Sequence, residues 1–117
     1  MAVAERRQSE LLRGVLDLCL LALIEAEPAY GYEMTKRLRE RGLAMVGEGS
    51  IYPLLGRLER DGLVETYRLE SSDGPPRKYY RPSRAGQRVL RRGIEEWQTA
   101  RAAIDAMLSP LEVEVEP

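Results

Sequence analysis

The chain has 117 residues, 44% of them hydrophobic and 32% charged, and its formal net charge is −1. This length suits one domain, and the hydrophobic fraction supports a folded core rather than a disordered chain. The absence of histidine and the single cysteine exclude a disulfide framework and make the common zinc sites and catalytic triads unavailable. We therefore predict a protein without a metal, a cofactor or a catalytic residue, that is, not an enzyme.

The longest apolar run, Leu18 to Ile24, is too short to span a bilayer, and no N-terminal segment has the pattern of a signal peptide. We expect a cytoplasmic protein with no membrane partner. Cys19 lies inside this run and is interpreted as an inert core thiol.

The first predicted helix runs from about Glu10 to Ala26, with Ser9 as its candidate cap. Residues 1–9 are polar and are expected to be frayed. The second half of this helix is apolar nearly all round, which indicates burial on more than one side. In so small a domain, we expect one of those sides to face a partner subunit.

A second helix is predicted over residues 30–41, with Met34 and Leu38 facing inward and Gly31 as a further inward candidate. Its lysine and arginine side chains lie mostly outward, and Gly42 ends it. A short glycine-containing connection leads to the next helix. Two helices joined in this way, the second with a basic outer face, match a helix-turn-helix.

The stretch from Gly47 to Val64 contains the second helix of that pair, which we interpret as a recognition helix for DNA. Gly49 or Ser50 is expected to cap its start, and Gly62 to supply a left-handed residue after its end. An apolar stripe recurs at steps of three and four residues: Ile51, Leu54, Leu55 and Leu58. The opposite face is short and basic, with small residues between long ones: Ser50, Tyr52, Pro53, Gly56, Arg57 and Arg60.

Residues 63–69 and 77–81 are predicted to form two strands joined by a loop over residues 71–76. We interpret this hairpin as a wing that packs on the helices, because an isolated hairpin is only marginally stable. Arg77 and Lys78 lie beside the predicted loop. Tyr79 and Tyr80 point to opposite faces of a strand, and the sequence leaves open which of them enters the core.

The last predicted helix begins at Ser83 or Arg84 and runs to about Leu108. A helix this long cannot bury its whole apolar seam on one winged domain, so we predict a homodimer. The predicted interface residues recur at steps of four and three: Leu90, Ile94, Trp97, Arg101, Ile104 and Leu108.

These elements predict a mainly α fold with a small β-hairpin, a winged helix-turn-helix followed by a long dimerisation helix. The expected segments are a frayed N-terminus (1–9), a winged domain (10–82) whose first helix also joins the dimer interface, a dimerisation helix (83–109) and an acidic disordered tail (110–117).

The charges are unevenly distributed along the chain. Residues 63–92 contain eight basic side chains against three acidic ones, whereas residues 93–117 contain one basic side chain against six acidic ones. DNA responds to the local patch rather than to the net charge, so the value of −1 does not exclude nucleic-acid binding.

The chain contains three spaced motifs: YGYE at Tyr30–Glu33, GSIYPLLGRLERDGLV at Gly49–Val64 and RKYYRPSRAG at Arg77–Gly86. Together with the first helix and IEEW at Ile94–Trp97, they resemble the PadR family of transcriptional regulators. The resemblance covers about residues 10–108, and a departure is Pro82, where the family commonly has an apolar residue. It implies a homodimeric repressor of the short subfamily that binds a palindromic operator of double-stranded DNA.

The wing and the order of the motifs favour DNA as the partner of the recognition helix. Arg57 and Arg60 are the candidates for base edges or nearby phosphates, since arginine reads guanine bidentately. Tyr30 is open between a packing role at the helix start and a phosphate contact. The predicted DNA-binding residues are Tyr30, Ser50, Tyr52, Pro53, Arg57, Arg60, Arg77 and Lys78.

Trp97, the only tryptophan, has two interpretations. It packs in the dimer seam, or it stacks on an effector. The second is implied by the resemblance, because in multidrug-binding members the matching tryptophan lines a pore between subunits and stacks on flat aromatic ligands; several relatives respond to phenolic compounds. The corresponding effector-binding residues are Leu11, Gly14, Val15, Leu18, Ile94 and Trp97.

Two alternatives belong to other classes. A winged-helix module for protein–protein contacts would carry an apolar or acidic outer helix face, which is absent. An enzyme is the weakest hypothesis, because no nucleophile with a nearby base and no phosphate-binding glycine loop is present.

Overall fold

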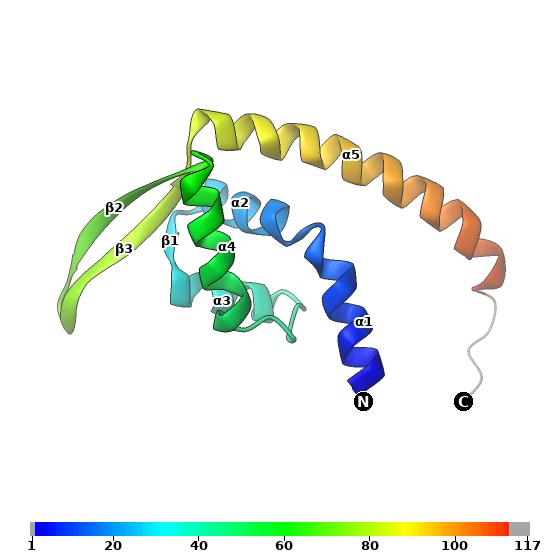
Figure 1. Ribbon diagram of the computed structural model, residues 1–117, viewed down its shortest axis with the longest axis horizontal. Coiled ribbons are helices and arrows are strands. Elements are labelled where there is room, and N and C mark those ends of the chain that lie inside the picture. Colours follow the sequence, from blue (N-terminus) through cyan, green and yellow to red (C-terminus); the bar gives the residue numbers. More distant parts are fainter. Residues whose placement is uncertain (1, 113–117) are drawn as a thin grey trace.

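The computed structural model of the chain describes residues 2–112. Helices pack together around the core, a hairpin projects from them, and the last helix runs across and beyond them (Figure 1). This arrangement confirms the predicted fold class. The elements are α1 (Ala2–Arg13), α2 (Leu16–Ala26), β1 (Ala29–Tyr30), α3 (Gly31–Glu40), α4 (Glu48–Arg60), β2 (Val64–Ser71), β3 (Gly74–Pro82), α5 (Arg84–Leu108) and a 3-10 helix (Ser109–Leu111).

The N-terminal region forms two helices where the sequence predicted a frayed end and one helix. Helix α1 begins at Ala2, because its residues are mostly strong helix formers such as Ala, Glu, Arg and Leu. The chain then leaves helical geometry at Gly14 and Val15. The φ and ψ of Val15 are −127° and −3°. Glycine weakens a helix interior, and α2 buries five residues in the core whereas Leu12 of α1 is only partly buried against it. The axes of the two helices diverge at this break (Figure 1).

The helix-turn-helix consists of α3 and α4. Both helices end in a left-handed glycine: the φ of Gly42 is 109° and that of Gly62 is 71°. After α4, Gly62 N–H donates to the Glu59 carbonyl at 3.1 Å and Leu63 N–H to the Leu58 carbonyl at 2.9 Å. This is a Schellman motif, which confirms the predicted role of Gly62.

The start of α4 differs from the prediction. Gly47, not Gly49 or Ser50, is the N-cap residue. Its carbonyl accepts from the N–H groups of Ser50 at 3.0 Å and Ile51 at 3.2 Å, so the cap lies two or three residues before the predicted positions. Pro53 consequently lies inside the helix, in its second turn.

The sheet has the strand order β1-β3-β2, with antiparallel pairs throughout. The short strand β1 was not predicted; it pairs Ala29 with Tyr80 and Tyr30 with Tyr79. The strands of the wing are also longer than predicted, and Pro75 and Pro76 belong to β3 rather than to the loop. The two prolines are tolerated in β3 because β1 pairs with Tyr79 and Tyr80, farther along that strand. The N–H groups that the prolines lack would therefore make no hydrogen bond to β1.

The core unites the three-helix domain with the wing. Tyr80 of β3 is only 8% exposed, whereas Tyr79 faces the other side, which answers the question that the sequence left open. Cys19 is half-buried, and burial raises the pKa of its thiol, so it stays protonated at neutral pH. The largest fully buried side chains are those of Leu20, Leu21, Ile24, Met34, Ile51 and Leu55.

Helix α5 is attached to the domain through its first part. The Oγ of Ser83 accepts from the N–H of Gly86 at 3.0 Å, so Ser83 is the N-cap and the helix begins at Arg84, one of the two predicted starts. Leu90 is 2% exposed and belongs to the core of its own protomer, so its prediction as an interface residue is wrong. The heptad pattern did not reveal this, because one apolar stripe runs along the whole of α5. The first part of the helix contacts α2, and the rest extends beyond α2.

Beyond Gly93 the described residues of α5 are all exposed, and the helix extends past the winged domain (Figure 1). Residues 109–111 form a 3-10 turn, and residues 113–117 of the predicted disordered tail lie outside the described part of the chain. No described helix, α5 included, is apolar over enough length to cross a bilayer.

Close packing at Gly86 generates a prediction about stability. A Cβ at this position would collide with the backbone carbonyl of Leu63, so Gly86→Ala is expected to destabilise the fold by about 1–3 kcal/mol. Gly49→Ala is the matched control, because nothing lies within 4 Å of a Cβ there and alanine is the better helix former. Thermal unfolding followed by circular dichroism compares the two. An unchanged Tm for Gly86→Ala would contradict this packing.

Candidate nucleic-acid interface

The outer face of α4 is the first component of the candidate site. Its apolar stripe is buried, as predicted, which leaves Ser50, Tyr52, Pro53, Arg57 and Arg60 exposed. Glu48 and Glu59 are exposed on the same helix, so the outer surface is less uniformly basic than the sequence suggested.

Tyr52 links α4 to α3. Its outer ring and hydroxyl atoms lie 2.5–2.8 Å from the place where a Cβ on Gly31 would stand, so a larger residue at position 31 would displace the tyrosine side chain. Burial, and then the charge of Glu48, raises the pKa of the Tyr52 hydroxyl. The hydroxyl therefore stays protonated at neutral pH and is able to donate a hydrogen bond to an anion such as a phosphate.

The two predicted DNA-binding residues of the wing, Arg77 and Lys78, lie on opposite faces of β3. The turn of the hairpin is at residues 72–73, and Arg77 and Lys78 pair with Leu69 and Arg68, away from that turn. Lys78 faces α4, where its Nζ lies 3.0 Å from Oε1 of Glu59. That hydrogen bond raises the pKa of Lys78. Lys78 is thus already paired with the recognition helix, and its predicted place beside the loop is wrong because the loop is shorter than expected.

Arg77 faces outward, onto a row of tyrosines. Its guanidinium carbon is 4.7 Å from the centroid of the Tyr30 ring. The Tyr79 ring lies 5.4 Å from that of Tyr30 and 5.8 Å from that of Tyr67. Tyr30 also begins α3, where its N–H donates to Oε1 of Glu33 at 3.3 Å. Tyr30 therefore packs at the start of α3, one of its two predicted roles. Its ring also holds the guanidinium of Arg77 through a cation–π contact.

Helix α4 has a neighbour on each side: the wing on one and α1 on the other (Figure 1). Between α1 and α4 lies an open groove of about 470 Å³. The contribution of α1 was not predicted, because a single helix was expected over residues 10–26 and its break after Arg13 was not. The groove is lined by Ser9, Leu12, Arg13, Leu16, Met45, Val46, Ser50, Pro53, Leu54, Arg57 and Arg60.

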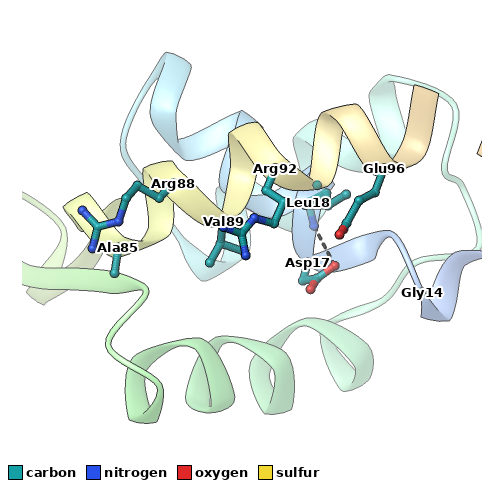
Figure 2. Close-up of a pocket in the computed structure, with 9 residues that line it drawn as sticks. Gly14, Asp17, Leu18, Ala85, Arg88, Val89, Arg92 and Glu96 are labelled. Atoms are coloured by element: carbon teal, nitrogen blue, oxygen red, sulfur yellow. Dashed lines mark hydrogen bonds between the residues drawn. The ribbon is translucent and has the colours of Figure 1, made fainter. Parts of the chain in front are cut away.

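A second open pocket, of about 390 Å³, lies between α2 and α5 (Figure 2). Of the predicted effector-binding residues, Gly14 and Leu18 line it, but Leu11, Val15, Ile94 and Trp97 do not. Figure 2 shows Arg88, Arg92 and Glu96 of α5 around it, opposite Asp17, whose Oδ1 accepts from the Leu18 N–H at 2.8 Å. A single protomer therefore does not bring the predicted effector residues together.

The sequence of the chain matches the family model described as the transcriptional regulator PadR-like family over residues 20–92. A crystal structure of a PadR-like transcriptional regulator from Bacillus cereus is 38% identical, with a TM-score of 0.78, and covers 85% of this chain and 96% of that one. A PadR family transcriptional regulator from Eggerthella lenta is 33% identical, with a TM-score of 0.80, and covers 97% of this chain and 96% of that one.

A transcriptional regulator of Mycobacterium tuberculosis is 34% identical over 90 residues, which are 74% of this chain and 82% of that protein. The winged helix-turn-helix, the long last helix and these matches agree with one another. The chain therefore belongs to the PadR-like family of transcriptional regulators, which act on DNA and are not enzymes.

Proposed function

We propose that this regulator is a homodimeric repressor that binds a palindromic operator through α4 and the wing, and that a flat aromatic effector releases it. The observation that carries the proposal is the apolar surface of α5, which a monomer would leave in water. The resemblance to regulators of known fold supports DNA as the partner.

The exposed row on α5 supports the dimer. Trp97 is 45% exposed, Ile94 38% and Ile104 46%, and Leu108 and Met107 beyond them are exposed as well. Arg101 in this row is bound within its own helix, since its Nε lies 3.5 Å from Oδ2 of Asp105. Exposed Leu11 on α1 offers a further apolar contact. Pairing two copies would cover such a surface, and two-fold symmetry is the commonest way to do so.

Two recognition helices in one dimer would read two half-sites. Arg57 and Arg60 project from the outer face of α4, and arginine pairs bidentately with guanine in the major groove. Ser50 and Tyr52, near the start of α4, are assigned to phosphates. A palindrome read on one face of the duplex requires the helices to sit about 34 Å apart.

Trp97 is assigned to the effector site. In a dimer paired along α5, the two indoles would face each other across the two-fold axis and form a slot for a planar aromatic molecule. Its neighbours are aliphatic and offer few polar anchors, so recognition would depend on shape and stacking. A ligand that binds more tightly to a dimer whose recognition helices have another spacing than the operator requires would weaken operator binding. The operator would weaken binding of that ligand by the same factor.

The dimer assignment predicts the effect of charges in the seam. The double variant Ile104→Glu and Leu108→Glu is expected to give monomers or insoluble chain, because carboxylates cannot be buried there unpaired. The control, Thr99→Glu with Ala106→Glu, places the same charges on the opposite side of α5 and should remain dimeric. Sedimentation equilibrium distinguishes the two. A seam variant that stays dimeric with a normal Tm would refute the assignment.

The DNA-binding assignment predicts different roles for two side chains. Arg57→Ala is expected to relax sequence preference and to weaken operator binding by ~1–3 kcal/mol. Lys78→Ala should weaken binding to all sequences alike and flatten the salt dependence by about one charge per subunit, if Lys78 exchanges Glu59 for a phosphate. Binding titrations on operator and scrambled duplexes at several salt concentrations measure both. Unchanged affinity and slope in both variants would exclude this DNA-facing surface.

The effector assignment is tested by tryptophan emission, because Trp97 is the only indole in the chain. Flat aromatic dyes and phenolic acids are expected to quench this emission as they stack, and calorimetry should show that Trp97→Ala binds them more weakly. No quenching below millimolar concentration, or equal binding by the variant, would mean that Trp97 serves only as interface packing.

A further inference from the structure

The groove between α1 and α4 contains one basic side chain, Arg13, that the proposed readout by α4 and the wing does not use. Its described lining residues include Arg13 from α1 together with Arg57 and Arg60 from α4, and no acidic side chain. Within the described part of the chain, no ion pair joins any of these arginines to a carboxylate. By contrast, Arg81 and Arg91 each have one, with Glu65 and Glu25.

Three guanidinium groups around one groove repel each other and lack an internal counter-charge. An anion that enters the groove would therefore be held by several donors at once. Ser9 and Ser50 add hydroxyl groups on opposite walls of the same groove. Planar guanidinium groups and hydroxyls are the side chains that usually contact phosphate oxygens.

The position of the groove identifies the source of that phosphate. The wing lies on one side of α4, and α1 lies on the other, toward the exposed half of α5 (Figure 1). If α5 pairs the subunits, the side of α4 that carries α1 is the one nearer the two-fold axis. In a duplex bound to α4 of both subunits, the segment between the two half-sites would then lie next to α1. The wings would contact the duplex outside the two half-sites.

We infer that α1 is a third DNA-contacting element, in which Arg13 holds a backbone phosphate of the segment between the half-sites. This inference rests on the proposed operator binding and extends it. Arg13 acts beside Arg57 and Arg60, and it contributes affinity rather than sequence preference, because phosphates are the same in every sequence.

The break at Gly14 and Val15 makes this placement possible. Without the break, α1 would continue along the axis of the buried helix α2. The break turns the chain so that α1 runs beside α4 (Figure 1). Along α1, Ser9, Leu12 and Arg13 face the groove. Arg7, six residues before Arg13, lies about a third of a turn from it and on the far side of α1 from Ser9 and Leu12.

The test uses Arg13→Gln, with Arg7→Gln as the control that removes the same charge from another side of α1. Arg13→Gln is expected to reduce the slope of log affinity against log salt by about 1.8, because each subunit of the dimer loses one contact worth about 0.9. The ratio of operator to scrambled-duplex affinity should not change. Arg7→Gln should keep the wild-type slope. Circular dichroism and sedimentation verify that both variants fold and dimerise like the wild type.

Methylphosphonate substitutions, which neutralise single phosphates, locate the contact. Neutral linkages between the half-sites should weaken the wild type and Arg7→Gln but not Arg13→Gln, and neutral linkages on the outer flanks should weaken all three equally. Equal slopes for the three proteins, or equal sensitivity to the central linkages, would overturn the inference while leaving operator binding intact.

Two further outcomes distinguish a failure of DNA binding from binding of a free anion in the groove. If the wild type shows no salt-dependent binding to duplex DNA, the proposed function itself fails, and this inference fails with it. If inorganic phosphate raises the Tm of the wild type but not of Arg13→Gln, and the DNA slopes are equal, the groove takes a free anion and the assignment to DNA is overturned.

Discussion

The junction of α4, the wing and α5 is the constraint on which the rest of the structure depends. Ser83 donates its hydroxyl to the Gly62 carbonyl at 2.6 Å, and its N–H donates to the Leu63 carbonyl at 3.0 Å. Gly86 then lets α5 pass directly against Leu63. The end of the recognition helix and the start of the proposed dimerisation helix are thereby held by short backbone contacts. A change in how two α5 helices meet would move α4 as well, which gives the proposed coupling between effector and operator a physical basis.

The candidate DNA surface is assembled from elements that are far apart in the sequence. Lys78 joins the wing to α4 through Glu59, Tyr52 joins α4 to α3 across Gly31, and α1 adds a wall beside Arg57. No acidic side chain lines the groove between α1 and α4, and Glu59 on α4 is paired with Lys78. This local excess of arginine is what a polyanion would meet, so the net charge is a poor guide to the partner.

Much of the fold followed from local patterns. The spacing of Ile51, Leu54 and Leu58 determined which face of α4 is buried, because helical periodicity alone decides that division. Gly62 and Ser83 marked helix boundaries, since a left-handed residue and a side-chain cap are requirements of the local backbone. The order of helices, hairpin and long last helix followed from the same local patterns, and it agrees with the match to the PadR-like family.

Other features were decided only by tertiary contacts. Strand β1 has two residues and no periodicity, so nothing local predicts it before β3 is present to pair with it. Tyr79 and Tyr80 are identical in type, and only the side on which the helices pack places Tyr80 in the core. Leu90 fits the exposed seam by spacing, yet the contact of α5 with α2 buries it. The sequence by itself determined the faces and ends of the main elements; the tertiary structure decided which face meets which neighbour, because those choices depend on residues distant in the chain.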